Sequence, residues 1–274
     1  MGPNVGRGYD FAVELGPDVV LRHRGEWHDT GQPCGERHGA GDGRSGGRAN
    51  QAGHALIDQM AAEPYETRGI LHSEAALLVV TCQAFGITHI VESGRARGQS
   101  TYMLGKYLPG VQVLSIEKRA DHPDEAFARE RLKELPNVRL ALGDGKVDLV
   151  PAVMAIANMG NRVAVLCDGP KGHEAIELVD ACLKHPNVRV GFIHDMRRLD
   201  HGAPSPYRAA AEARFEESRF TDDPEYVRVL SWMDENIAKA GGPCGPDHEK
   251  VFGSYGPTIG AFFNPKQSEI GKGQ

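Results

Sequence analysis

Acidic residues recur at a nearly constant spacing through the middle of the chain. Glu92, Glu117, Asp144, Asp168 and Asp195 are separated by 25, 27, 24 and 27 residues. Each of them lies at or just past the end of a short run of β-forming residues. A single acid in such a place could simply cap a turn or a helix. Five in register predict a row of carboxylates along one edge of a sheet, which is where such sheets bind ligands.

The first acid opens a glycine-containing loop with the sequence VESGRARGQS. Gly94 and Gly98 suit a backbone that turns sharply and approaches a ligand closely. A dinucleotide site would need G-x-G-x-x-G, with the pyrophosphate over a helix N-terminus. Here the spacing is G-x-x-x-G, and Glu92 precedes it. Because a carboxylate repels phosphate but attracts an amine or a sulfonium, the loop favours S-adenosylmethionine over NAD.

Strands and helices that could position these residues alternate along the chain. Helical patterns are expected at 49–63, 73–86, 124–136 and 173–186. This alternation predicts a doubly wound, mostly parallel Rossmann-like α/β sheet in a three-layer α/β/α arrangement. The segment YGPTIGAFF predicts an antiparallel last strand. The five β-rich runs are Ile87–Val91, Val111–Ile116, Val138–Leu142, Val163–Cys167 and Val188–Ile193.

Four segments together resemble one family. VESGRARGQS has the form E-x-G-x-x-x-G-x-S that opens the catechol and caffeoyl-CoA O-methyltransferase group of class I S-adenosylmethionine-dependent methyltransferases. LSIEKR is similar to the second strand of that group, and VRLALGDGKVDLVPAV to its third strand and following turn. VLCDGPKG has its D-x-x-K spacing. The resemblance covers roughly residues 70 to 200 and implies an enzyme that methylates a small-molecule hydroxyl group.

The resemblance also implies roles for particular residues. Glu117 would take the ribose hydroxyls, and Asp168 would bind a divalent metal such as Mg²⁺ together with Asp195. Such a metal could lower the pKa of the acceptor hydroxyl, and Lys171 would act as the base. The implied cofactor-binding residues are Glu92, Gly94, Gly98, Ser100, Glu117, Asp144, Gly145 and Asp168.

Other residues leave alternatives open. His173 and His194 are bases that could serve without a metal, although lone histidines are more commonly structural. Where the metal-dependent group usually has Asp-Asn, this chain has Met196 after the acid, which weakens the metal prediction. Arg95 and Arg97 could meet the methionine carboxylate, but exposure to solvent is the favoured interpretation.

Composition limits the class of protein. The 274 residues carry a net charge of −6, which argues against a nucleic-acid partner. No apolar run approaches the roughly 18 residues that cross a bilayer, and the five cysteines include no C-x-x-C pair. Together with an N-terminus that lacks a signal-peptide pattern, this predicts a cytoplasmic protein with reduced thiols. The expected partner is a small-molecule acceptor, and a homodimer is left open.

The chain divides into three parts by composition. Residues 1–52 are rich in Gly, Arg and His and predict a flexible arm, whose His and Cys spacing matches no zinc pattern. Residues 53–264 form the predicted methyltransferase domain, and 265–274 a tail. Within the domain, Tyr207, Trp232 and Tyr255 could shape an acceptor pocket. Two other functions stay open: an NAD(P)-linked oxidoreductase, and a non-catalytic adenosyl-ligand-binding or interaction module.

Overall fold

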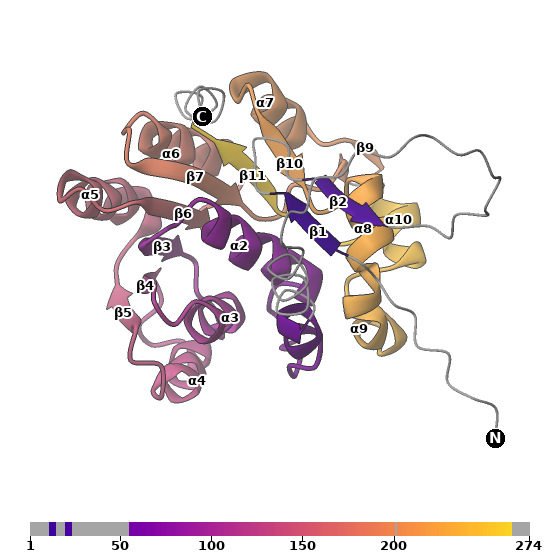
Figure 1. Cartoon of the computed structure of the whole chain (residues 1–274), viewed down its shortest axis with the longest axis horizontal. Coiled ribbons are helices and arrows are strands. Elements are labelled where there is room, and N and C mark those ends of the chain that lie inside the picture. Colours follow the sequence, from indigo (N-terminus) through magenta and orange to yellow (C-terminus); the bar gives the residue numbers. More distant parts are fainter. Residues whose placement is uncertain (1–10, 15–19, 24–54, 201, 265–274) are drawn as a thin grey trace, which may run out of the picture.

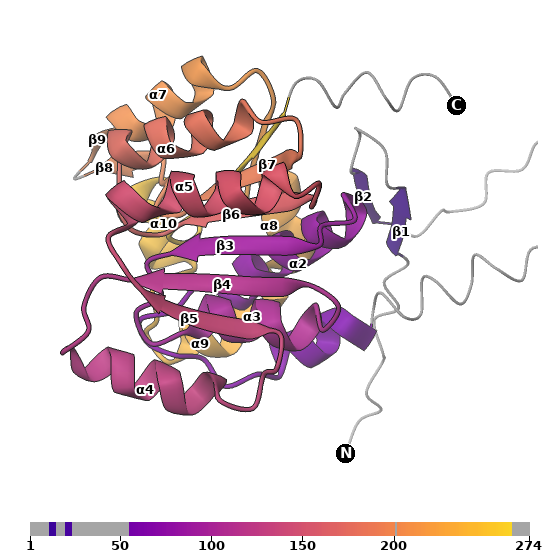
Figure 2. The same ribbon diagram turned by 90° about the vertical axis from the view of Figure 1, so that its left-hand side faces the viewer.

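A seven-stranded sheet forms the middle layer of the computed structural model, which describes residues 11–14, 20–23, 55–200 and 202–264 (Figures 1 and 2). Its strands are β3 (His89–Ser93), β4 (Gln112–Glu117), β5 (Val138–Leu142), β6 (Val163–Cys167), β7 (Val188–Ile193), β10 (Ser218–Phe220) and β11 (Gly260–Phe263). They lie in the order β10-β11-β7-β6-β3-β4-β5. β11 runs antiparallel to both of its neighbours, β10 and β7, and the other neighbouring strands of this sheet pair parallel. The predicted mostly parallel sheet with an antiparallel last strand is therefore confirmed.

Helices cover both faces of the sheet, as Figure 2 shows. Adjacent residues Ile90 and Val91 of β3 point to opposite faces and belong to two different apolar clusters. The Ile90 cluster includes side chains of α2, α3 and α8, whereas the Val91 cluster includes side chains of α5, α6 and α7. The predicted three layers are thus present. The helices are α2 (His72–Ala84), α3 (Gln99–Tyr107), α4 (Pro123–Leu132), α5 (Gly145–Asn158), α6 (His173–Leu183), α7 (Pro206–Arg214), α8 (Pro224–Leu230), η1 (Ser231–Asp234), α9 (Glu235–Lys239) and α10 (Pro246–Phe252).

The predicted elements differ from the observed ones mainly at their ends. The strand expected at Ile87–Val91 begins at His89, because the Ile87 backbone N–H donates to the Cys82 carbonyl and so closes the end of α2. The other four β-rich runs agree with the observed strands within one residue, whereas the strand expected at 255–263 begins only at Gly260. Residues 224–239 form three short helical segments in succession, α8, η1 and α9.

The N-terminal part of the chain contributes one described hairpin. Strands β1 (Phe11–Glu14) and β2 (Val20–His23) pair antiparallel, and residues 55–61 are helical. The flexibility predicted for the rest of residues 1–52, and the predicted tail at 265–274, lie outside the described residues. Two-residue strands β8 (Leu199–Asp200) and β9 (Ala203–Pro204) form a second small hairpin.

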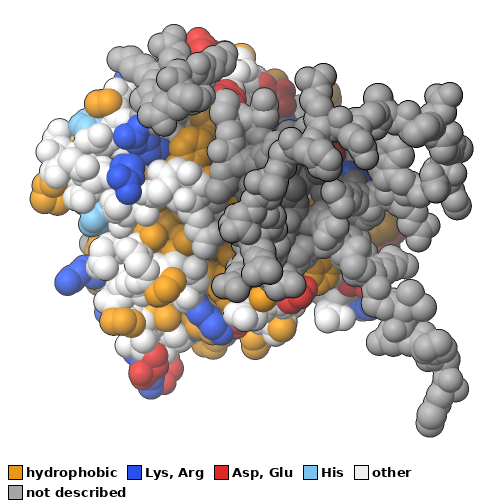
Figure 3. Space-filling model, viewed as in Figure 1, with side chains coloured by type: hydrophobic (Ala, Val, Ile, Leu, Met, Phe, Trp, Pro, Cys, Tyr) orange, Lys and Arg blue, Asp and Glu red, His pale blue; other side chains and the backbone are white. Residues whose placement is uncertain are grey.

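Charged side chains are spread over the surface of the described part. On the face that Figure 3 shows, Lys and Arg side chains lie in small separate groups among uncharged ones. None of the helices in the described ranges is long and apolar enough to cross a membrane.

A buried carboxylate joins the C-terminal helices to α2. Asp234, at the end of η1, is fully buried, and its Oδ1 accepts a hydrogen bond from the Ser73 backbone N–H at 3.2 Å. Burial raises the pKa of the Asp234 carboxyl to about 7, and the hydrogen bonds from Ser73 offset only part of this effect. The folded protein therefore holds a proton that the unfolded chain releases near pH 4.

This proton predicts how stability depends on pH. Between about pH 4 and pH 7 the folded state binds more protons than the unfolded state, so the free energy of unfolding falls as pH rises. Asp234→Asn removes this loss. Relative to wild type, the variant should therefore gain about 3 kcal/mol of unfolding free energy between pH 5 and pH 8. Urea unfolding at the two pH values measures the gain.

A matched control is Asp247→Asn on α10, whose side chain is 96% exposed. This control should show no such gain, because Lys250 lowers the pKa of its carboxyl instead of burial raising it to near neutral. If Asp234→Asn changed the free energy of unfolding equally at pH 5 and pH 8, the raised pKa would be refuted.

Candidate active site

An open cavity of about 520 Å³ lies at the carboxyl edge of the sheet, and its size is that of a small-molecule site. The chain runs from β3 outward to β4 and β5 on one side, and to β6 and β7 on the other. The crevice between β3 and β6 is therefore the switch point of the sheet, where open α/β sheets bind ligands. The cavity is lined by Arg68, Gly94, Ala96, Glu117, Arg119, His122, Asp124, Glu125, Asp168, Lys171, His194 and Asp195.

Glu117 lies at one end of this cavity, at the last position of β4. Its carboxylate accepts backbone N–H bonds from Ala96 at 3.0 Å, Lys118 at 2.9 Å and Arg119 at 3.2 Å. These bonds fix the carboxylate against the glycine loop. Since a carboxylate offers about four lone-pair positions, capacity remains for a hydroxyl group of a ligand.

Glu92 lies beneath the loop rather than on the cavity wall. Its carboxylate is fully buried and accepts hydrogen bonds from the hydroxyl groups of Ser100, Thr101 and Ser115, the last at 2.6 Å. Burial raises the pKa of Glu92, although these three bonds oppose the shift. Glu92 and Ser100 therefore join the first turn of α3 to β3 and β4.

Glycines let the loops at the switch point approach one another. Gly94 has φ of +90°, and a Cβ there would lie 2.4 Å from the backbone nitrogen of Gly169. Gly145, at the start of α5, faces the same loop, since its Cβ would lie 2.6 Å from the Gly169 carbonyl oxygen. Gly98 precedes α3, and its Cβ would lie 3.0 Å from Leu132. Of the predicted glycines, only Gly94 lines the cavity.

Asp144 caps a helix. Its Oδ1 accepts the Lys146 backbone N–H at 3.1 Å, which satisfies the N-terminus of α5. Its Oδ2 lies 2.6 Å from Lys118 Nζ, and that lysine lowers the pKa of the Asp144 carboxyl. Asp144 does not line the cavity. In this structure its carboxylate caps the N-terminus of α5.

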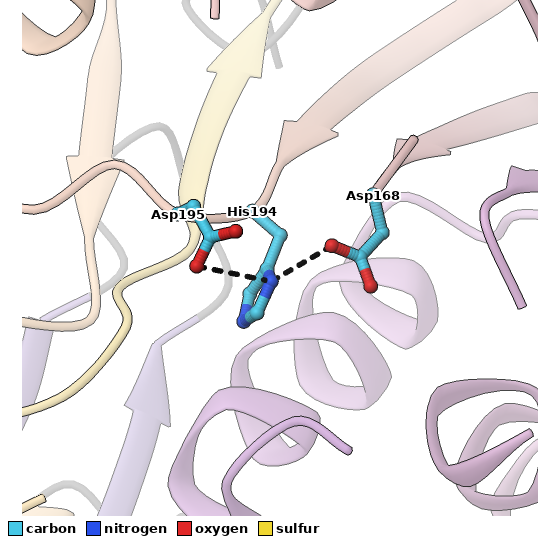
Figure 4. A group of neighbouring side chains, drawn as sticks. All are labelled: Asp168, His194 and Asp195. Carbon is cyan, nitrogen blue, oxygen red and sulfur yellow. Dashed lines mark hydrogen bonds and ion pairs between the residues drawn. The ribbon is translucent and has the colours of Figure 1, made fainter. Parts of the chain in front are cut away.

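A cluster of four charged side chains forms the other end of the cavity. The Lys171 ammonium donates to Asp168 and lies 2.7 Å from Asp195 Oδ2. The His194 ring lies between the two aspartates (Figure 4). Its Nδ1 is 2.8 Å from Asp168 Oδ1 and 3.7 Å from Asp195 Oδ1. On the other side of the ring, His194 Nε2 lies 3.5 Å from a carboxylate oxygen of Glu74, a buried residue of α2.

Opposite charges in this cluster stabilise one another. Burial alone would raise the pKa of Asp168, but His194 and Lys171 outweigh it and hold the pKa below its usual range. Burial would lower the pKa of His194, but Asp168 and Glu74 raise it to about 10. Likewise, the two aspartates raise the pKa of Lys171 despite its desolvation. At neutral pH the lysine is therefore an ammonium ion, which is not a base.

Asp195 differs from its neighbours in backbone and exposure. Its φ is +63°, a conformation that non-glycine residues rarely adopt and that is concentrated at functional sites. Its side chain is 36% exposed, compared with 20% for Asp168 and 9% for His194. Of the two aspartates, Asp195 is therefore the more accessible to a molecule in the cavity.

A divalent metal is implied by the family resemblance, but the residues present do not fit one. Asp168, His194 and Asp195 each offer a ligand atom within 4.8 Å of the others. However, Lys171 already contacts the carboxylates of Asp168 and Asp195. His194 Nδ1 is paired with Asp168. Met196, at the position of the expected carboxamide, is buried in the apolar cluster between the sheet and α6. No metal-dependent step follows from this arrangement.

Other predicted residues lie away from the cavity wall. His173 begins α6 and is exposed, and its ring packs edge-on against Tyr207 at a centroid distance of 5.3 Å. The Tyr255 hydroxyl donates to the Ser231 carbonyl at 3.0 Å, and Trp232 packs against the apolar core. The structure thus does not bring His173, Tyr207, Trp232 or Tyr255 together with Asp168.

Sequence reasoning missed the residues on the α4 side of the cavity. They come from the N-terminus of α4, from the residue after Lys118 and from the turn before α2. A signal was available, because His122 followed by Pro123 is a typical start of a helix, and this helix starts just after the acid that ends β4. The missed residues are Arg68, Arg119, His122, Asp124 and Glu125.

The expectation that Arg95 points to solvent is wrong. Arg95 is 2% exposed, and it donates to Glu125 and to the Ser115 carbonyl at 2.6 Å. Glu125, from α4, supplies the opposite charge that makes burial of a guanidinium tolerable. Arg97 is 30% exposed and pairs with Glu66 at 2.8 Å. Both arginines therefore attach neighbouring segments to the loop.

Solved structures similar to this chain include O-methyltransferases in complex with SAM or SAH. The cofactor-bound protein Rv0187 from MTB is 17% identical, with 79% of this chain and 90% of that chain covered and a TM-score of 0.48. An O-methyltransferase from Bacillus cereus in complex with SAH is 17% identical (78% and 90% covered, TM-score 0.43). The O-methyltransferase TomG from Streptomyces achromogenes, in complex with SAM, is 17% identical (76% and 89% covered, TM-score 0.44). No family model and no curated protein matches the chain.

Proposed function

We propose that the protein is an S-adenosylmethionine-dependent methyltransferase that acts on a hydroxyl oxygen of a small molecule. The charge of the cavity carries this proposal. Among the side chains that line it, five are carboxylates and three are Arg or Lys, and with protonated His194 as a fourth cation the lining keeps a net negative charge. A cationic sulfonium is favoured in such surroundings, whereas the pyrophosphate of a dinucleotide is not. The first turn of α3, where a pyrophosphate would bind, is joined instead to the carboxylate of Glu92.

Two ends of the cavity suggest two roles. Glu117, held by three backbone N–H groups, would bind the ribose hydroxyls. The backbone at Gly94 would face the methionine part, between Glu117 and the charged cluster of Asp168, Lys171 and Asp195. Asp144 and Gly145, which cap and begin α5, would support the adenine side from behind the wall.

The charged cluster supports the chemistry. When bound, S-adenosylmethionine supplies a methyl group that forms a bond to the acceptor oxygen while the electron pair of the broken C–S bond stays on sulfur. The acceptor must also lose its hydroxyl proton. Asp195 would take it as the methyl group is transferred, because Lys171 and His194 are already protonated and Asp195 is more exposed than Asp168. Burial would raise the pKa of Asp195, but His194 and Lys171 outweigh it and lower this pKa, so Asp195 would pass the proton on readily to solvent. The Lys171 ammonium would stabilise the negative charge that develops on the acceptor oxygen.

Calorimetry with S-adenosylhomocysteine and NADH tests the cofactor. We expect S-adenosylhomocysteine to bind with a micromolar Kd, about −8 kcal/mol, and NADH to give no heat. Glu117→Ala should weaken the first binding by roughly 1.5–3 kcal/mol, the range for a hydrogen bond to a charged group.

Glu130→Ala is the matched control, since that glutamate lies on α4 with its side chain 72% exposed. It should leave the Kd unchanged. Binding of NADH without S-adenosylhomocysteine would instead favour an oxidoreductase. Binding of S-adenosylhomocysteine with no transfer to any hydroxyl compound would favour an adenosyl-ligand-binding module.

A further inference from the structure

Lys171 is placed as a cation between two carboxylates. It lies in the loop between β6 and α6, and its Nζ contacts both Asp168 and Asp195, at 2.7 Å from the Oδ2 of the latter. Without a positive charge two carboxylates this close would repel, and one would tend to stay protonated. The lysine supplies that charge from within the chain.

The surroundings of this pair favour an ammonium ion over a metal ion. Lys171 and His194 Nδ1 approach the same oxygen of Asp168, Oδ1. A hard cation such as Mg²⁺ needs oxygen ligands in a near-octahedral arrangement. Met196, which follows Asp195 in the chain, has its side chain buried among apolar ones. The carboxylates therefore have cationic partners already, and Met196 offers no oxygen ligand at this position.

We propose that Lys171 takes the place of a divalent metal in this site, so that its ammonium group, and no bound metal ion, is the resident cation of the Asp168–Asp195 pair. Lys171 lines the cavity with 47% of its side chain exposed. Its charge can therefore reach a bound acceptor oxygen as well as the two carboxylates. This role rests on the proposed methyltransferase function, but the test of it does not require an acceptor.

The experiment measures metal binding to the full chain and its variants. Mn²⁺ is titrated by calorimetry into wild type, Lys171→Gln and Lys171→Arg. Wild type and Lys171→Arg should bind no Mn²⁺ at millimolar concentration. Lys171→Gln should bind it with a Kd roughly tenfold or more below that millimolar limit, because the neutral amide removes one of the two cations, Lys171 and His194, that contact the carboxylates. Asp195→Asn added to Lys171→Gln should abolish this binding.

Lys146→Gln is the matched control, because that lysine lies outside the cavity, where it pairs with the exposed Glu174. It should behave as wild type. Circular dichroism establishes that each variant is folded. Two outcomes would overturn the proposal: stoichiometric Mn²⁺ binding by wild type that Asp195→Asn removes, and failure of folded Lys171→Gln to gain Mn²⁺ binding.

Failure of this proposal differs from failure of the proposed function. S-adenosylhomocysteine binding, measured on the same wild-type sample, depends on Glu117 and the glycine loop at the other end of the cavity. If wild type binds S-adenosylhomocysteine and also Mn²⁺, the methyltransferase proposal stands and the role of Lys171 falls. If it binds neither, the methyltransferase proposal falls while an internal cation at Asp168 and Asp195 remains.

Discussion

Replacing Gly94 with alanine is expected to weaken S-adenosylhomocysteine binding strongly and to destabilise the fold by about 4 kcal/mol. Two effects add. At φ of +90° an L-residue is strained, which costs of order 1–3 kcal/mol. In addition, the new Cβ would lie 2.4 Å from Gly169 N and 2.7 Å from the Asp168 carbonyl carbon. These are backbone atoms, so the loop after β6 has to move.

This movement reaches the cavity from two sides. Gly94 and Ala96 line one wall, and Asp168 and Lys171 line the adjoining one. We therefore expect the Kd for S-adenosylhomocysteine to rise roughly 100-fold or more, about 2.7 kcal/mol. Calorimetry and urea unfolding measure the two effects separately.

Gly160→Ala separates strain from crowding. Gly160 has φ of +86°, close to that of Gly94, but no atom of the described residues lies within 4 Å of the Cβ position. This control should cost only the backbone strain, on the order of 1–3 kcal/mol, and leave the Kd unchanged. If both variants lost the same stability and both bound normally, close packing at Gly94 would not be what the site requires.

Most of the sheet follows from the sequence because its signals are local. Apolar runs of five or six residues between helical patterns predict strands wherever both sheet faces are covered, and the runs at Val138–Leu142, Val163–Cys167 and Val188–Ile193 are strands with those bounds. Three-residue β10 is too short to give such a signal. Its pairing with β11 depends on a partner about 40 residues further along the chain.

The site was less predictable because burial and pairing are not local. Asp168, Lys171 and Asp195 come together since β6 and β7 are adjacent parallel strands, which the alternation of elements predicts. The position of Glu74 against His194 could not be predicted, because 120 residues of chain separate them. Similarly, the sequence around Asp144 does not distinguish an acid that faces a ligand from one that caps a helix. In the structure Asp144 caps the helix, because its Oδ1 accepts the Lys146 backbone N–H.

Arg95 shows the same limit most clearly. An arginine between two glycines has the composition of a solvated loop, and only the fold reveals its partner, Glu125 of α4. Its guanidinium is fully buried, with hydrogen bonds to that carboxylate and to the Ser115 carbonyl. The pair joins the loop after β3 to the helix after β4. Since Glu125 lines the cavity, this contact also sets the shape of the cavity wall.

Removing one member of this pair is expected to be costly. Arg95→Ala should lower the free energy of unfolding by about 3–5 kcal/mol, because it leaves the Glu125 carboxylate buried without its main partner. Arg129, 51% exposed and 2.8 Å from the other carboxylate oxygen, can compensate only in part. Urea unfolding at pH 7 measures the loss.

The double variant Arg95→Met with Glu125→Met tests whether the loss comes from the charge left behind. Replacing both charges with apolar side chains of similar length should restore most of the stability lost in Arg95→Ala, since buried ion pairs exchange for apolar contacts at little net cost. The control is Arg68→Ala, because Arg68 is 54% exposed and pairs with Asp124 at 2.5 Å on the same rim. An exposed pair of this kind contributes only about 0–1 kcal/mol. If Arg95→Ala were as mild as Arg68→Ala, the buried pair would not be what holds α4 against the glycine loop.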